Sequence, residues 1–123
     1  MKGRGMNREE LLKAITDRQA IEVELSFGKA YIMPLTRSQF DHCSALAAKL
    51  QKDMTADRAG AVRWYAISNA WVDEKGSRVL DPQSKEDRAL FDSFKAGDTE
   101  RLFEAILDSS SVSKEDRDFL SNG

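Results

Sequence analysis

The run AVRWYAISNAW at Ala61–Trp71 constrains the fold more than any other stretch of this chain. Its apolar residues recur at helical spacing, and Arg63 and Asn69 are its only strongly polar positions. A helix that is apolar most of the way round is normally buried by neighbours on several sides. Trp64 and Trp71 fall two turns apart on one face and are interpreted as core aromatics, with a tryptophan-lined groove for a partner as the alternative. The run therefore predicts a central helix around which the other elements pack.

Length and composition are those of one globular domain. The chain has 123 residues, of which 41% are hydrophobic and 33% charged, which is typical of a soluble protein. No apolar run approaches the roughly 20 residues of a membrane span, and the N-terminus does not resemble a secretory signal. The single cysteine, Cys43, excludes an internal disulfide and fits a reducing compartment. We expect a disordered leader at residues 1–6, a single α-rich domain at residues 7–123, no membrane partner and a cytoplasmic location.

The charge is unevenly distributed along the chain. Residues 1–20 carry five Lys or Arg and three Asp or Glu, whereas residues 73–123 carry eight and thirteen. An acidic C-terminal half is unfavourable for binding a phosphate backbone, so we expect no nucleic-acid partner. A basic protein surface would suit this charge, and an ordinary solvated surface is the alternative.

Asn7 marks the start of the first predicted helix. It is a good N-cap, and Glu10 three residues later completes a capping box. We expect this helix to end between Asp17 and Ala20. Its narrow apolar edge is formed by Leu11, Leu12 and Ile15.

A β-hairpin follows the first helix. Ile21–Phe27 alternates apolar and polar residues, and Gly28-Lys29 is a two-residue loop with Gly first, as a type II′ turn requires. Ala30–Leu35 then returns antiparallel, with Leu25 opposite Ile32. Pro34 limits the second strand to an edge or an end.

Tyr31 and Met33 are the candidate partner-binding residues. In the expected register they fall on the face opposite Val23 and Leu25, so both are expected on the outer surface of the hairpin. An exposed Tyr and Met beside an edge strand form a candidate docking surface. The alternative is that a helix covers them.

Capping residues place the remaining helices. We expect helices to begin after Thr36, after Thr55 or Asp57, after Ser84, after Asp98 or Thr99, and after Ser113. The helix after Ser84 is expected to turn Leu90, Phe91 and Phe94 inward and to end at Gly97. The predicted fold is therefore α+β and mostly α-helical, with about five to six helices and one N-terminal β-hairpin.

The chain carries little that could perform chemistry. His42 is the only histidine, and its neighbour Cys43 points about 100° away from it on a helix, so the two do not form a catalytic pair. Cys43 falls on an apolar stripe and is interpreted as a core residue. Pairs of acidic residues sit in the first turns of predicted helices, where they favour the helix dipole. We predict no enzyme, no catalytic residue, no cofactor and no metal site.

Two segments carry a family resemblance. WVDEKGSRVL at Trp71–Leu80 and LFEAILDSSSVSKED at Leu102–Asp116 follow a strand pair that ends in PLT and a helix that begins RSQFD. This order of pieces resembles the tail assembly chaperones of long, non-contractile-tailed bacteriophages and their prophages. The likeness covers about Ile21–Leu120.

The resemblance implies a non-catalytic protein that binds the aggregation-prone tape measure protein, recruits tail tube subunits and is absent from the mature virion. Members of that family are often made in two lengths by a ribosomal frameshift, and a chain ending Ser121-Asn122-Gly123 would fit the short form. The family has no compact motif whose residues could be transferred to this chain. The sequence leaves homo-oligomerisation open. The alternative function is a small bacterial adaptor or regulatory protein that binds another protein.

Overall fold

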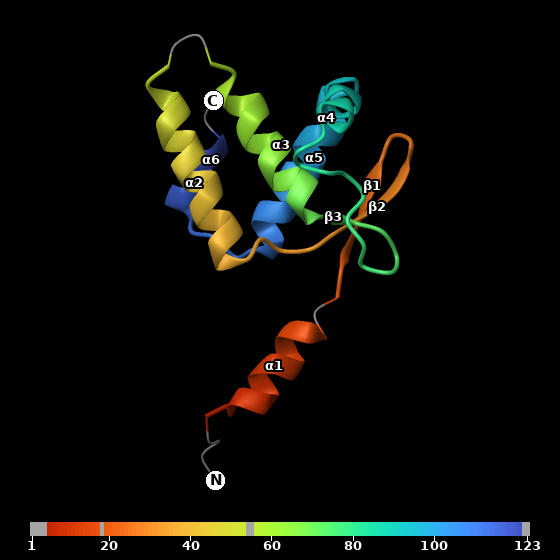
Figure 1. Cartoon of the computed structure of the whole chain (residues 1–123), viewed down its shortest axis with the longest axis vertical. Helices are drawn as coiled ribbons and strands as arrows, with labels where there is room; N and C mark the ends of the chain where they lie inside the picture. Colours follow the sequence, from red (N-terminus) through yellow and green to blue (C-terminus); the bar gives the residue numbers. More distant parts are fainter. Residues whose placement is uncertain (1–4, 18, 54–55, 122–123) are drawn as a thin grey trace.

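The computed structural model describes residues 5–17, 19–53 and 56–121, and within them the chain forms six helices and a three-stranded antiparallel sheet (Figure 1). The predicted class, α+β and mostly helical, is confirmed. Residues 1–4 of the expected leader lie outside the described residues, as does Thr55. The elements are α1 (Arg8–Thr16), β1 (Ile21–Leu25), β2 (Gly28–Ile32), α2 (Arg37–Gln51), α3 (Arg58–Ala70), β3 (Trp71–Val72), α4 (Lys85–Asp92), α5 (Ala96–Ser109) and α6 (Lys114–Ser121).

The β1–β2 hairpin forms, but the predicted register is wrong. Leu25 pairs with Gly28 rather than Ile32, so the turn consists of Ser26 and Phe27. The Asp98 carboxylate fixes this turn, because it accepts hydrogen bonds from the Ser26 backbone N–H at 2.9 Å and from the Ser26 hydroxyl at 2.5 Å. The shift of four residues is even, so Val23, Leu25 and Tyr31 keep their predicted faces. Phe27, predicted as the end of the first strand, instead lies in the turn and is 58% exposed.

The central helix ends one residue earlier than predicted. Trp71 leaves the helix with extended backbone angles, and Trp71–Val72 forms β3 against Tyr31 and Ile32 of β2. The Met33 N–H donates to the Ala70 carbonyl at 2.8 Å, and this hydrogen bond joins the end of β2 to the end of α3. Trp71 therefore does not share a helix face with Trp64. Both indoles are nevertheless buried, which confirms their interpretation as core aromatics.

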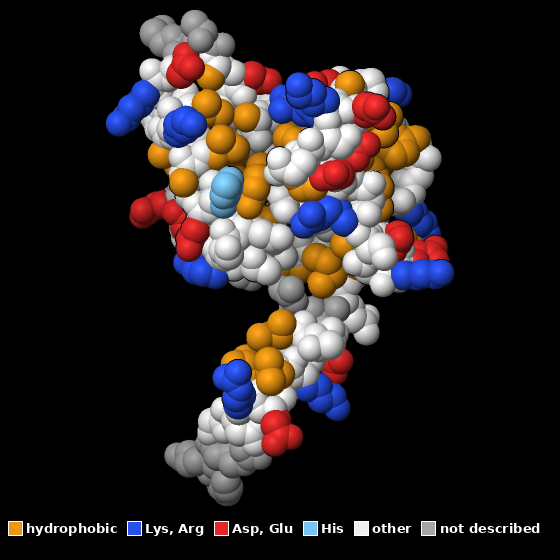
Figure 2. Space-filling model, in the orientation of Figure 1, with side chains coloured by type: hydrophobic (Ala, Val, Ile, Leu, Met, Phe, Trp, Pro, Cys, Tyr) orange, Lys and Arg blue, Asp and Glu red, His pale blue; other side chains and the backbone are white. Residues whose placement is uncertain are grey.

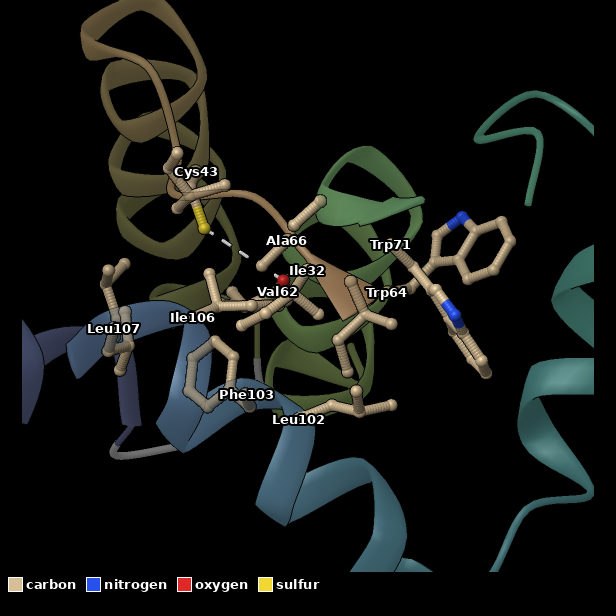
Figure 3. Close-up of a cluster of buried hydrophobic side chains, with 14 of the residues drawn as sticks. Ile32, Cys43, Val62, Trp64, Ala66, Trp71, Leu102, Phe103, Ile106 and Leu107 are labelled. Atoms are coloured by element: carbon tan, nitrogen blue, oxygen red, sulfur yellow. Dashed lines mark hydrogen bonds between the residues drawn. The ribbon is translucent and has the colours of Figure 1, made fainter. Parts of the chain in front are cut away.

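Helix α3 lies at the centre of the core (Figure 3). It packs against α2 and α5, and α6 closes the side where α2 and α3 meet. Cys43 is fully buried on α2, as predicted, and its thiol approaches the Val62 carbonyl of α3 at 4.0 Å. The predicted apolar face of α5 is also buried; it consists of Leu102, Phe103, Ile106 and Leu107.

Helix α4 and the segment that follows it contact the body through aromatic rings. Phe91 packs on Trp64 with centroids 5.3 Å apart, and Phe94 packs on Trp71 at 5.8 Å. Leu90, predicted to face inward, is 54% exposed, because Phe91 sets the buried side and its neighbour lies about 100° away. The predicted helix end at Gly97 is also wrong, since α4 ends at Asp92 and Gly97 lies in the first turn of α5.

Arg58 ties α6 to the rest of the core, a role that the sequence did not indicate. Its side chain is buried at the start of α3. Nε donates to the Ala47 carbonyl at 3.1 Å, Nη2 donates to the Phe119 carbonyl at 2.5 Å, and the guanidinium stacks on the Phe119 ring. One planar cation thus joins α2, α3 and α6.

Helix α1 stands apart from this body (Figure 1). The predicted capping box is present, since the side chains of Asn7 and Glu10 each accept the backbone N–H of the other. No residue of α1 is buried.

Candidate protein-binding surface

The two faces of the sheet differ in their cover. Val23, Leu25, Ala30 and Ile32 point to the inner face and are buried, with α5 packed against β1 and β2. Tyr31 points to the outer face, where it pairs with Glu22 on one side and Val72 on the other. The alternation of a half-buried sheet therefore places Tyr31 away from the core.

Tyr31 and Met33 line one cleft on this outer side. The cleft has a volume of 640 Å³ and lies between the C-terminal end of α1 and the turn that follows β3. Both side chains are half-buried. The structure thus brings the two predicted partner-binding residues together in an open cleft. Its other walls are formed by Thr16, Gln19, Ala20, Asp73, Glu74, Lys75 and Gly76.

Tyr31 also borders a second hollow, of 450 Å³. This hollow is lined by Lys29, Ala30, Tyr31, Trp71, Val72, Asp73, Glu74, Lys75 and Val79. We call the two hollows together the outer groove. Trp71 is only 8% exposed, so it contributes an edge of this hollow and not a tryptophan-lined groove.

The turn at residues 73–77 forms a rigid wall of the outer groove. Its Asp73 carboxylate accepts the backbone N–H groups of Lys75 at 2.8 Å and Ser77 at 2.9 Å. The Asp73 N–H donates to the Ser77 carbonyl at 2.8 Å, and Gly76 takes φ +87°. Only glycine adopts that angle readily, so the DEKG sequence specifies this turn.

The chemistry of the outer groove suits an amphipathic protein segment. Tyr31 offers a rigid ring with a polar tip, and Met33 offers a flexible thioether that adapts to different side chains. The exposed side chains of Asp73, Glu74, Lys75 and Lys29 provide a charged rim. An apolar strip flanked by charges is the surface that binds one face of a helix or of an extended peptide.

Figure 2 shows one face of the molecule, on which apolar side chains gather on α1 and recur on the body, interspersed with charged ones. The walls of the outer groove come from three segments of the chain: Thr16, Gln19 and Ala20, then residues between 29 and 33, and then residues between 71 and 79. Strand alternation predicts Tyr31 and Met33 as surface residues, and Gly76 predicts the turn. No local pattern encodes the β2–β3 pairing that brings these segments together.

The residues considered for catalysis lie elsewhere. Burial raises the pKa of the Cys43 thiol to about 11, an effect that the positive charge of Arg58 partly offsets. Cys43 is therefore a protonated core residue at neutral pH and a poor nucleophile. His42 is exposed and stacks on the Tyr65 ring with centroids 4.4 Å apart. Among the described residues, no three His, Cys, Asp or Glu side chains gather in a way that could hold a metal ion.

Comparison with known proteins gives no relative to argue from: no protein-family model, curated protein or solved structure matches this chain. In the part of the chain that the structure describes, none of the helices has the length and apolar character needed to cross a membrane.

Proposed function

We propose that this protein is a phage tail assembly chaperone that binds the tape measure protein, helps to recruit tail tube subunits and catalyses no reaction. The resemblance of residues 71–80 and 102–116 to that family supports the proposal. The observation that carries it is the outer groove, whose larger hollow is lined by both Tyr31 and Met33.

The outer groove has the properties that such a partner requires. A tape measure protein presents long apolar helix faces that aggregate when they are unpaired. A chaperone must cover part of such a face and release it later, which a shallow groove with a charged rim can do better than an enclosed pocket. The site of action would be the host cytoplasm, and the protein would be absent from the mature virion.

The excess of acidic groups in residues 73–123 supports the same role. Net charge of one sign keeps a protein with exposed apolar surface from associating with itself. It also favours a partner whose apolar helices are flanked by Lys or Arg. We therefore propose basic amphipathic helices of the tape measure protein as the segments that are bound.

Co-expression with the tape measure protein of the same phage tests this function. We expect wild-type protein to keep that partner in the soluble fraction and to co-purify with it. The double variant Tyr31→Ala, Met33→Ala should lose most of this effect, because it removes the apolar floor of the outer groove. The soluble amount of the tape measure protein is the measurement.

Leu90→Ala is the matched control, since Leu90 is an exposed apolar residue on α4 that does not line the outer groove. It should rescue the partner as well as wild type does. Circular dichroism melting curves establish that both variants are folded. If wild-type protein leaves the tape measure protein insoluble, the proposed function is wrong; if the double variant rescues fully, the outer groove is not the binding surface.

A further inference from the structure

Strand β1 is an edge of the sheet, since the strand order is β1-β2-β3. Hydrogen-bonded pairs alternate along two antiparallel strands, and Leu25 and Gly28, which flank the two-residue turn, form the first of them. Val23 and Leu25 therefore direct their backbone N–H and C=O groups toward β2. The backbone groups of Glu22 and Glu24 point the other way, out of the sheet.

A hydrogen bond at the tip of the hairpin agrees with this alternation. The Ser26 N–H, two residues beyond Glu24, points out of the sheet and donates to the Asp98 carboxylate of α5 at 2.9 Å. Asp98 thus occupies the place of an added strand at the tip. Farther back, no described residue bonds the outward N–H and C=O groups of Glu22 and Glu24. We call these two residues the open edge.

A hollow of 680 Å³ lies along the open edge. One of its walls is β1, and the other is α5, which contributes Arg101 and the half-buried Ala105. Neighbouring strands lie about 4.8 Å apart, and their side chains alternate between the two faces of a sheet. Every second side chain of a strand added to the open edge would therefore point into this hollow, where Ala105 offers an apolar contact.

The opposite face of the open edge is acidic. Glu22 and Glu24 are both exposed there, and Lys29 of β2 lies 3.5 Å from the Glu22 carboxylate. Among the described residues, no Lys or Arg forms an ion pair with Glu24. A second copy of β1 along this edge would bring the carboxylates of both copies together, which disfavours self-pairing. A strand with Lys or Arg opposite these residues would be attracted instead.

We propose that the open edge binds an extended segment of another protein as a fourth, antiparallel strand, in which two Lys or Arg residues flank an aliphatic residue. The N–H and C=O groups of Glu22 and Glu24 pair with its backbone. The basic side chains lie beside the two carboxylates, and the aliphatic side chain enters the hollow at Ala105. Antiparallel pairing is the slightly more stable arrangement for each residue. This site is separate from the outer groove and does not depend on the function proposed for it.

The pentapeptide acetyl-Val-Lys-Val-Lys-Val-amide is a probe of the open edge. It is titrated into isotope-labelled full-length protein, and the backbone amides are followed by nuclear magnetic resonance. We expect the amide signals of Glu22 and Glu24 to shift, and hydrogen exchange at these two N–H groups to slow, because they pass from water to a strand partner. Acetyl-Val-Glu-Val-Glu-Val-amide, which has the opposite charge, should change neither.

Methylated peptides test the backbone pairing on the wild-type protein. In the antiparallel arrangement, the lysines opposite Glu22 and Glu24 direct their N–H groups toward β1, whereas the valines direct theirs away. The peptide that is N-methylated at both lysines should therefore not bind. The peptide that is N-methylated at two valines carries the same number of methyl groups and should bind as the parent peptide does.

Substitutions at Glu24 separate the backbone contribution from the charge. Glu24→Pro removes the charge and the outward N–H, at a position where an edge strand tolerates proline. It should weaken peptide binding by about tenfold. Glu24→Gln keeps the N–H and should weaken binding by only about twofold. Glu86→Gln makes the same charge change at an exposed position of α4 and should bind as wild type does. Circular dichroism melting curves establish that each variant is folded.

The proposal is wrong if the amides of Glu22 and Glu24 do not respond to the parent peptide, or if the lysine-methylated peptide binds as well as the parent. Loss of binding on methylation of the valines alone would contradict the antiparallel arrangement. Protection of the two N–H groups that grows with protein concentration, without peptide, would assign the open edge to a second copy.

The two binding sites can fail separately. The double variant Tyr31→Ala, Met33→Ala should still bind the peptide, because neither side chain supplies a backbone group of the open edge. Glu24→Pro should still keep the tape measure protein soluble. Loss of peptide binding in the double variant would contradict the separation of the open edge from the outer groove.

Discussion

At the scale of single residues, Asp98 shows how one side chain positions an element. It is 2% exposed, and both of its carboxylate oxygens accept hydrogen bonds from Ser26, at the tip of the hairpin. These two hydrogen bonds, with smaller help from Arg101 and Lys95, hold the pKa of Asp98 below its ordinary value. The carboxylate is thereby more stable as an anion in the folded protein than in the unfolded chain.

Asp98 should make the stability of the fold sensitive to acid. Its contribution is complete above the unfolded pKa of about 4 and is lost as the pH falls through the lower folded pKa, because the unfolded chain then binds the proton more readily. We expect Asp98→Asn to be less stable than wild type at pH 7 and to lose less stability than wild type between pH 5 and pH 3. Urea denaturation at each pH measures both effects.

Ser26→Ala is the control for this prediction, because it removes the hydroxyl donor and keeps the backbone N–H. At pH 7, Ser26→Ala should lower the free energy of unfolding by less than Asp98→Asn does. If the free energy of unfolding depends on pH in the same way for wild type and Asp98→Asn, then Asp98 is not the cause of the acid sensitivity.

The sequence does not reveal this role. Its local pattern assigns Asp98 to a helix start, and the partner Ser26 lies 72 positions away. Local sequence patterns indicate helix caps and the buried faces of helices and strands, but they do not indicate hydrogen bonds between residues far apart in the chain. The role of Arg58 cannot be predicted for the same reason, because its hydrogen-bond acceptors are carbonyl groups of α2 and α6.

At the scale of the elements, the features that local chemistry controls are predictable. Thr36, Ser84 and Ser113 each accept the backbone N–H three residues later, as their positions indicate, and Asp57 caps α3. The strand β3 is not predictable, because two residues directly after a helix continue its apolar pattern. Only the pairing with β2 makes them a strand.

Two glycine substitutions test the corrected element boundaries. Gly28 takes φ +146°, so Gly28→Ala should destabilise the fold by about 1–3 kcal/mol through backbone strain alone, since a Cβ there meets no atom within 4 Å. Gly97 lies in α5 with equally open space and no positive φ, so Gly97→Ala should stabilise by about 0.5–1 kcal/mol. Chemical denaturation gives both values.

The opposite signs make each variant the control for the other. A destabilised Gly97→Ala would mean that Gly97 ends α4 in a left-handed conformation, as the sequence pattern indicates. A neutral Gly28→Ala would mean that the hairpin turn does not need that backbone angle.

At the scale of the whole molecule, the candidate site is a product of topology. The outer groove is formed by the C-terminal end of α1, the outer face of β2 and the turn after β3. These three segments come together only when the sheet is assembled. Length predicts a single domain, helical spacing and capping residues predict that it is α-rich, and strand alternation places Tyr31 and Met33 on the outer face. The groove itself is beyond sequence reasoning, because its walls are separated along the chain.

Site-specific photo-crosslinking tests the central claim, that the tape measure protein lies in the outer groove. A photo-crosslinking amino acid replaces Lys75 on the rim of the groove or, as a control, the likewise exposed Lys49 on α2. The account predicts an adduct with the co-expressed tape measure protein from position 75 and none from position 49. An adduct from position 49 alone would contradict it.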